Sequence, residues 1–288
     1  MMERSSSTDR FQPVTSKNSG EITEVLPDLA YLTDQIVNLV FVGNPEPGNP
    51  WVLVDSGMPR SGKTVIEKAE ERFGPDRPPE AIVLTHGHFD HIGGIIDVLK
   101  KWQVPVYAHP AEHPYLTGRE QYPDPDITVE GGMLAKLSFL YPTDPIDISE
   151  FLRALPEDGS VPPLPGWRWI HTPGHSEGHI SLFRDEDRAL IAGDAFVTVR
   201  QDELYKVLTQ EKELTGPPRY LTPDWAAAEA SVHLLTGLKP AYAITGHGAA
   251  AEGSWLTEHL EQLDRNFKEL AVPDHGKYVD ESDKPAEQ

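Results

Sequence analysis

One short segment of the chain concentrates side chains that bind metal ions. It runs from Thr85 to His91, reads Thr-His-Gly-His-Phe-Asp-His, and contains three imidazoles and one carboxylate. Imidazole nitrogen and carboxylate oxygen are the usual ligands of zinc and of neighbouring first-row metals. The alternative is a set of solvated loop histidines in a chain that has 12 of them. The density of the cluster favours a metal site.

The residues before this segment indicate how its side chains are placed. Residues 81–84 are apolar and predict a buried strand. Alternate residues of an extended segment point to the same side, whereas a helix would separate His86 and His88 by roughly 200°. We therefore expect both histidines to leave the strand end together, with Asp90 and His91 just before the next helix.

Three later segments share one pattern, an apolar strand that ends in a histidine or an aspartate beside glycine. They carry His175, Asp194 and His247. Glycine allows close approach of the backbone at such strand ends. We expect neighbouring strand ends to bring these three side chains to the first cluster.

Together with Val-Leu-Val-Asp-Ser-Gly at 52–57, these segments resemble the five sequence motifs of metallo-β-lactamase-fold metallohydrolases, in the same order. That superfamily includes glyoxalase II, lactonases, some β-lactamases and ribonuclease Z. The resemblance covers about residues 21–270. It implies an α/β fold, an αββα sandwich of two mixed β-sheets with helices on the outer faces.

The resemblance also implies two adjacent metal sites. The expected ligands are His86, His88 and His175 for the first ion, Asp90, His91 and His247 for the second, and Asp194 as a bridge between them. We expect two divalent ions, zinc foremost, although this ligand set also accepts iron, manganese or cobalt. Asp55 and His179 are expected to orient the ligands. Asp90 is also the expected proton carrier.

A dinuclear site of this kind predicts hydrolysis. Metal ions lower the pKa of bound water from 15.7 to about 7, so a bridging hydroxide is available near neutral pH. We expect it to attack a carbonyl carbon whose oxygen one ion polarises. The chain contains no cysteine, which excludes a thiolate nucleophile, thiolate ligands and disulfides.

The expected substrate is a small, fairly neutral ester, lactone or thioester. The sequence at 263–269 and the acidic tail after it disfavour a glutathione thioester, and the net charge of −21 disfavours tRNA. Two alternatives stay open: a mono-iron persulfide dioxygenase and, less favoured because no export signal is visible, a β-lactam hydrolase. A non-enzymatic binding module is disfavoured because all seven ligand positions are filled.

The apolar pattern runs without a break and predicts one domain over 21–272. The polar residues 1–20 and 273–288 are expected to be poorly ordered tails. Thr222 and Pro223 predict a helix start, as a capping residue followed by proline. Strands are expected at 22–32, 36–43, 51–55, 81–85, 105–108, 167–171, 180–184, 188–193 and 241–245, and helices at 61–73, 93–102, 223–238 and 254–270.

Residues 110–165 are expected to be an insertion, with one helical stretch at 132–140. Its aromatic and apolar residues predict either a lid over the metal cleft or a contact between two copies in a homodimer. Tyr205 is an expected substrate contact, with packing as the alternative role. We expect a cytoplasmic protein that acts on a small molecule and has no nucleic-acid or membrane partner, since no apolar segment is long enough to span a bilayer.

Overall fold

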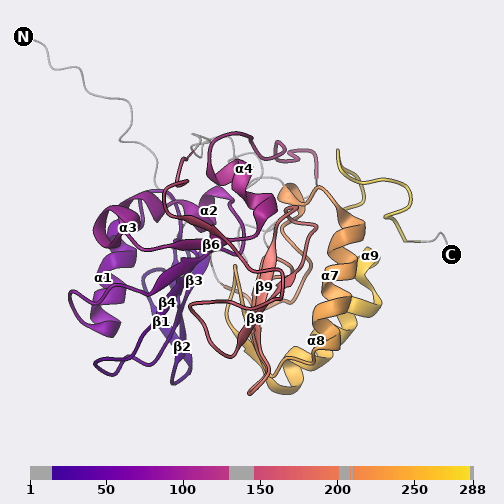
Figure 1. Cartoon of the computed structure of the whole chain (residues 1–288). Helices are drawn as coiled ribbons and strands as arrows, with labels where there is room; N and C mark the ends of the chain where they lie inside the picture. Colours follow the sequence, from indigo (N-terminus) through magenta and orange to yellow (C-terminus); the bar gives the residue numbers. More distant parts are fainter. Residues whose placement is uncertain (1–14, 130–145, 201–207, 209, 286–288) are drawn as a thin grey trace, which may run out of the picture.

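The computed structural model describes residues 15–129, 146–200, 208 and 210–285. Within them, two β-sheets lie between layers of helices, as Figure 1 shows. Both sheets are mixed, so the predicted αββα sandwich is confirmed. The predicted helix at 132–140 and Tyr205 lie outside the described residues.

The first sheet carries the N-terminal half of the chain. Among the described residues its strand order is β1 (Ile22–Leu26), β2 (Leu29–Asp34), β3 (Val37–Val42), β4 (Val52–Val54), β5 (Ala81–Val83), β6 (Val106–Ala108) and β7 (Leu152–Ala154). Strands β1 to β4 pair antiparallel, and β4 to β7 pair parallel. The expected single strand at 22–32 is therefore two strands. They turn at Pro27, whose ring fixes φ and removes a backbone donor.

The second sheet carries the C-terminal half. Its described strands follow the order β12 (Ala251–Glu252), β11 (Tyr242–Thr245), β10 (Ala189–Gly193), β9 (Ile180–Arg184) and β8 (Trp167–His171). Strands β10 and β11 pair parallel, and β9 and β10 form an antiparallel hairpin. Parallel strands end at the same edge of a sheet, so β10 and β11 deliver their following loops to one place.

Alternating side chains build the apolar layers. On β3, Leu39 packs with α1 (Gly62–Phe73) and α3 (Ile95–Trp102), whereas the next residue, Val40, packs with side chains of the second sheet. This period of two is what a strand buried on both faces requires. Figure 1 shows α1 and α3 outside the first sheet, and α7 and α8 outside the second.

The helices of the C-terminal half depart from prediction at their ends. Helix α7 (Trp225–Gly237) is capped by Asp224, whose side chain accepts a hydrogen bond from Ala227 N at 2.8 Å. The predicted cap, Thr222, instead donates its hydroxyl to a backbone carbonyl. The expected last helix is divided at Asn266 into α8 (Gly253–Arg265) and α9 (Phe267–Leu270).

The helical region after the first histidine cluster is also divided. Helix α2 (Phe89–Ile92) contains Asp90 and His91, and two glycines separate it from α3. A Cβ on Gly94 would collide with the backbone oxygen of Ser56. The glycines therefore allow this turn to pack against the loop after β4, a contact that helical periodicity alone does not predict.

The expected insertion is partly attached to the core. It contains the short helices η1 (Pro110–Glu112) and α4 (His113–Leu116), and β7 adds an edge strand to the first sheet. Another short helix, η2 (Arg219–Leu221), precedes α7. In the described part of the chain, no helix combines the length and apolar character needed to cross a bilayer.

The C-terminal segment is not a free tail over its described residues. Tyr278 donates its hydroxyl to Asp124 O at 2.8 Å, Lys277 N donates to the side chain of Asp126, and Val279 packs against the core of the C-terminal half. Polar contacts with Asp124 and Asp126 and the packing of Val279 therefore hold this segment against the insertion and the C-terminal core.

Candidate metal centre

The seven predicted ligands meet in one buried cluster. They are His86, His88, Asp90, His91, His175, Asp194 and His247, and each is at most 5% exposed. Three groups among them place their ligand atoms within 4.8 Å of one another: His86 with His88 and His175, Asp90 with His91 and His247, and His86 with His91 and Asp194. The first two groups are the two predicted ligand sets. The third contains the predicted bridging carboxylate.

Asp55 holds the first histidine loop from the neighbouring strand. Its carboxylate accepts hydrogen bonds from Thr85 N at 2.8 Å and Thr85 Oγ1 at 2.7 Å, and it lies 2.9 Å from His91 Nδ1. This contact turns the other ring nitrogen, Nε2, towards the centre. Asp55 has a φ of 61°, a conformation that L-residues with a side chain seldom adopt and that is common at functional sites.

His179 lies beside the ligand groups and belongs to none of them. Its Nε2 accepts a hydrogen bond from Asp194 N at 2.9 Å, and its Nδ1 lies 2.8 Å from Thr172 Oγ1. The ring therefore fixes the backbone of the bridging candidate. A similar role falls to Thr222, whose hydroxyl is 3.3 Å from His175 Nδ1 and which sequence reasoning assigned to a helix cap.

The loop of His247 is held by the opposite sheet. His247 Nδ1 is 2.8 Å from Ile36 O, so its Nε2 faces the carboxylates of Asp90 at 3.4 Å and Asp194 at 3.3 Å. Asn38 donates to Thr245 O and to a second backbone oxygen of the same loop. Sequence reasoning missed Asn38, since its partners lie more than 200 residues away.

Unpaired donor atoms test whether this cluster fits a cation. Among the described residues, His86 Nε2, His91 Nε2, Asp90 Oδ1 and Asp194 Oδ1 are buried and have no hydrogen-bond partner. Such groups are costly when buried, and a metal ion would satisfy all four. The space beside Asp194 is kept open by Gly246, where a Cβ would overlap Asp194 Oδ1. The donors therefore fit divalent metal binding.

Burial and charge set the protonation of the imidazoles. Burial lowers the pKa of His88 to about 4 and that of His175 well below its usual value, so both are neutral, the form that binds metals. Burial also disfavours the charged form of His247, but Asp194 and Asp90 outweigh it and raise the pKa of His247 to about 10. The pKa of His91 is raised well above normal for the same reason. Without an ion, the neighbouring carboxylates therefore favour the protonated forms of His91 and His247.

Glu112 is a second residue that the sequence did not reveal. It lies at the end of η1 in the insertion and is fully buried. Its carboxylate accepts hydrogen bonds from Gly87 N and Gly178 N, and from the hydroxyls of Ser176 and Tyr122. No local motif marks it, because its partners come from three other segments.

The loop of His175 also contains a second pattern, and an expected absence of a Gly-x-Ser-x-Gly motif from the sequence is wrong. Residues 174–178 read Gly-His-Ser-Glu-Gly, which matches the Gly-x-Ser-x-Gly of serine hydrolases. That motif needs a helix after the serine, but strand β9 follows here. Ser176 Oγ donates to Glu112 at 2.7 Å. The serine is therefore a hydrogen-bond donor within the loop, and its neighbour His175 belongs to the metal cluster.

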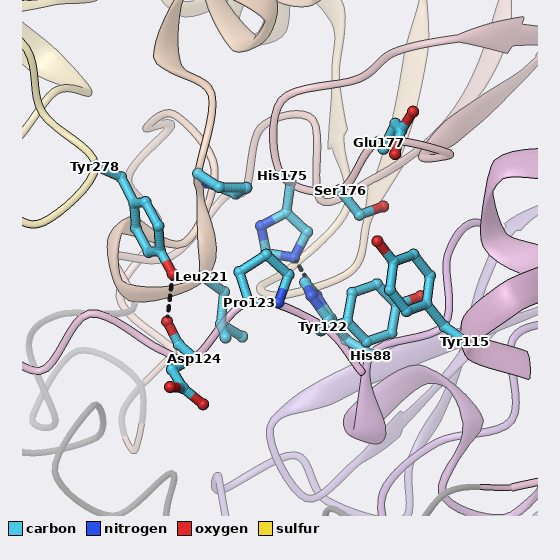
Figure 2. A pocket seen from close by; sticks show the side chains of 11 residues that line it. His88, Tyr115, Tyr122, Pro123, Asp124, His175, Ser176, Glu177, Leu221 and Tyr278 are labelled. Carbon is cyan, nitrogen blue, oxygen red and sulfur yellow. Dashed lines mark hydrogen bonds between the residues drawn. The ribbon is translucent and has the colours of Figure 1, made fainter. Parts of the chain in front are cut away.

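A pocket of about 190 Å³ opens onto the centre (Figure 2). Its described lining residues are His88, Tyr115, Tyr122, Pro123, Asp124, His175, Ser176, Glu177, Leu221, Pro223 and Tyr278. Of these lining residues, His88 and His175 also belong to the ligand cluster. The rings of Tyr115 and Tyr122 stack with centroids 4.0 Å apart. Part of the insertion and the C-terminal segment thus form the pocket walls.

The chain is similar in sequence to proteins named as hydrolases. The chain is 48% identical over 256 residues to the probable metallo-hydrolase YflN of Bacillus subtilis (strain 168), which covers 89% of this chain and 97% of that protein. It is also 30% identical over 119 residues to a hydroxyacylglutathione hydrolase of Rhodopseudomonas palustris (strain BisB5), over 41% of this chain and 34% of that enzyme.

Solved structures share the fold. The di-iron-bound form of TTHA1623 has a TM-score of 0.53 and 27% identity, and covers 84% of this chain and 98% of its own. The metallo-beta-lactamase SMB-1, bound to 2-mercaptoethanesulfonate, has a TM-score of 0.55 and 19% identity, and covers 83% of each chain. The family model of the metallo-beta-lactamase superfamily matches residues 32–247. The chain therefore belongs to the metallo-beta-lactamase superfamily.

Proposed function

We propose that this protein is a metal-dependent hydrolase that holds two divalent ions, zinc foremost, and cleaves a small uncharged ester, lactone or thioester. The observation that carries the proposal is the buried cluster of seven His and Asp side chains beneath a pocket with aromatic walls. The extensive identity to a protein named as a probable metallo-hydrolase supports the same reaction class.

The residues divide the work of such a site. When bound, the ions would supply a hydroxide near neutral pH and polarise the scissile carbonyl. His86, His88 and His175 are the proposed holders of one ion, Asp90, His91 and His247 of the other, with Asp194 between them. Asp55 and His179 keep the ligand side chains in place through the contacts described above.

Asp90 is the proposed proton carrier. Its Oδ2 lies 3.4 Å from His247 Nε2, and its Oδ1 is buried without a hydrogen-bond partner. Burial raises the pKa of Asp90, but His91 and His247 outweigh it and hold that pKa below its usual value. In the metal-free chain Asp90 is therefore an ionised carboxylate, and beside a bound ion its carboxylate would pass a proton to the leaving group.

The pocket walls support an uncharged substrate. Among the described lining residues there are two carboxylates, Asp124 and Glu177, and no lysine or arginine. The whole chain has a net charge of −21, which repels anions at longer range. The same charge argues against a nucleic-acid partner. Apolar contacts with Leu221 and the stacked tyrosines would then supply most of the binding energy.

A paired substrate panel tests this proposal. Neutral esters, lactones and thioesters are compared with analogues that carry a carboxylate, including a glutathione thioester. We expect kcat/KM to be at least about 10-fold higher for the neutral member of each pair, since a like charge near the pocket raises the barrier. Equal or better cleavage of the anionic members would contradict the proposed substrate class.

Metal content tests the reaction class separately. Protein purified without added metal is examined by elemental analysis and assayed after chelation and reloading. Two zinc ions per chain, and activity that disappears and returns with metal, are expected. One iron per chain, with oxygen uptake on a persulfide, would instead favour the dioxygenase alternative.

A further inference from the structure

Glu112 connects both parts of the first ligand set. Its Oε2 accepts a hydrogen bond from Gly87 N at 2.9 Å, and Gly87 lies between His86 and His88. Its Oε1 accepts from Ser176 Oγ at 2.7 Å and from Gly178 N at 3.0 Å, in the loop that carries His175. One carboxylate therefore joins two loops whose ligands, His88 and His175, are 87 residues apart in sequence.

The same carboxylate reaches the substrate pocket. Tyr122, whose ring stacks on Tyr115 in the pocket wall, donates its hydroxyl to Glu112 Oε2. Burial and the nearby Glu112 raise the pKa of Tyr122 well above 10, so the phenol keeps its proton and remains a donor. Tyr122 therefore presents its ring to the pocket, while its hydroxyl donates to Glu112 and accepts from Gly87 N at 3.0 Å.

Glycines in both loops allow Glu112 and Tyr122 to approach the backbone closely. A Cβ on Gly178 would lie 2.7 Å from Glu112 Cγ, and a Cβ on Gly87 would lie 2.5 Å from Tyr122 Oη. Real Cβ atoms do not approach so closely. Both glycines thus serve the contact with Glu112, in addition to flanking metal-binding residues.

We propose that Glu112 is a positioning residue, which fixes the loops of His88 and His175 relative to one another and ties them to the pocket wall through Tyr122. The proposal concerns metal binding and therefore rests on the proposed function. It adds a structural link, through Glu112, between the proposed ion site and the insertion that forms part of the pocket wall. The donor set of four, two of them backbone N–H groups, matches an ionised carboxylate and no other side chain of this size.

Glu112→Gln tests the proposal with almost no change in shape. The amide replaces one acceptor oxygen by an NH2 group, which cannot accept a hydrogen bond. The hydroxyls of Ser176 and Tyr122 can rotate, but the backbone N–H groups cannot. In either orientation of the amide, one ligand loop loses its backbone contact. The matched control is Glu150→Gln, at an exposed position of the same insertion.

Zinc affinity is measured by competition with a chromophoric chelator, and ligand geometry by the visible absorption spectrum of the Co²⁺-loaded protein. We expect Glu112→Gln to weaken zinc affinity by about 10–100-fold, as loss of a partner behind metal ligands does, and to change the Co²⁺ spectrum. Glu150→Gln is expected to change neither. Tyr122→Phe removes the link to the pocket wall and one of the two acceptors of Gly87 N, so it should raise KM and weaken zinc affinity less than Glu112→Gln does.

Unchanged zinc affinity and an unchanged Co²⁺ spectrum in a folded Glu112→Gln protein would overturn the proposal. If that variant does not fold, Ser176→Ala removes one donor and should weaken zinc affinity roughly 3- to 10-fold. No loss in Ser176→Ala would overturn the proposal as well.

Amide hydrogen exchange separates this proposal from the proposed function. In metal-free protein, Glu112→Gln should speed exchange at both Gly87 and Gly178, although no ion or substrate is present. A wild-type chain that binds no zinc would refute the proposed function. In that case faster exchange at both amides would still support the positioning role of Glu112, and unchanged exchange would contradict it.

Discussion

At the residue scale, Asp194 faces three imidazoles at once. Its Oδ1 is 3.6 Å from His91 Nε2, and its Oδ2 is 3.4 Å from His175 Nε2 and 3.3 Å from His247 Nε2. Asp194→Asn removes the negative charge that offsets the metal ions, and it places an amide NH2 group beside the three imidazoles. We expect loss of bound metal and at least a ~100-fold loss of kcat, measured by elemental analysis and steady-state kinetics. A metal-loaded, fully active variant would refute the bridging role.

Gly246 offers a sharper test, because it carries no functional group. A Cβ there would overlap Asp194 Oδ1 and lie 2.9 Å from His91 Cε1. Gly246→Ala should therefore push these side chains apart and lower metal affinity, while the fold is retained. Gly237→Ala is the matched control, since a Cβ at the end of α7 meets nothing within 4 Å. Equal metal affinity in both variants would argue against a crowded centre at Gly246.

The ligands were predictable because each stands in a short local pattern, an apolar strand followed by His or Asp with glycine. The residues that hold them were not. Asn38, Glu112 and Thr222 act on partners brought near by the fold, and an Asn, a Glu or a Thr in isolation has no such signature. The sequence around Ser176 resembles a serine-hydrolase motif, whereas the structure shows its hydroxyl donating to Glu112.

At the element scale, the C-terminal segment depends on one carboxylate. Burial raises the pKa of Asp126, but hydrogen bonds from Thr128 and Lys277 N outweigh it and hold the pKa below 3.8. A carboxyl with a depressed pKa stabilises the folded state fully above its unfolded pKa, and this contribution disappears as the pH falls through the folded value. The segment should therefore remain attached at neutral pH and detach in acid, as the pH falls through the lowered pKa of Asp126.

Asp126→Asn should reproduce that detachment at neutral pH. Asparagine keeps one acceptor oxygen and loses the charge, which weakens the contacts to Thr128 and Lys277 by about 1 kcal/mol. We expect faster trypsin cleavage after Lys277 and a higher KM, because Tyr278 lines the pocket. Asp274→Asn, at an exposed position of the same segment, is the control. Identical cleavage rates would show that the apolar anchor alone holds the segment.

Periodicity located most strands and helices, but element ends followed tertiary contacts. Thr222 and Asp224 are both good caps, but the hydroxyl of Thr222 donates to Pro218 O and contacts His175, and Asp224 caps α7. Likewise, helical propensity does not reveal that Gly93 and Gly94 separate α2 from α3. Their role depends on the backbone of a loop more than 30 residues earlier.

At the scale of the whole molecule, the buried donors predict that metal stabilises the fold. A ligand that binds only the folded state adds RT ln(1 + [L]/Kd), about 2.7 kcal/mol at 100 times Kd. Chelation should lower the Tm by on the order of 5–10 °C in a chain of this length. Differential scanning calorimetry with and without chelator measures the shift. A Tm that is unchanged by chelator and by added zinc would contradict a metal-stabilised centre.

The four-layer arrangement was predictable as a whole because the motifs occur in order along the chain and the apolar runs alternate with amphipathic helices. The pocket was not. Its walls combine residues near 115–124 with Leu221 and Tyr278, which come from three regions of differing composition. Sequence reasoning identified the insertion as a candidate wall and left out the C-terminal segment.

The predicted ligands are divided between the two halves of the sandwich. The first half supplies His86, His88, Asp90 and His91, and the second supplies His175, Asp194 and His247. A chain whose second half has not docked lacks one donor from each predicted set and the carboxylate between them. A centre that uses all seven side chains therefore requires contact between the two halves, and only a chain that extends through residue 247 contains the full set.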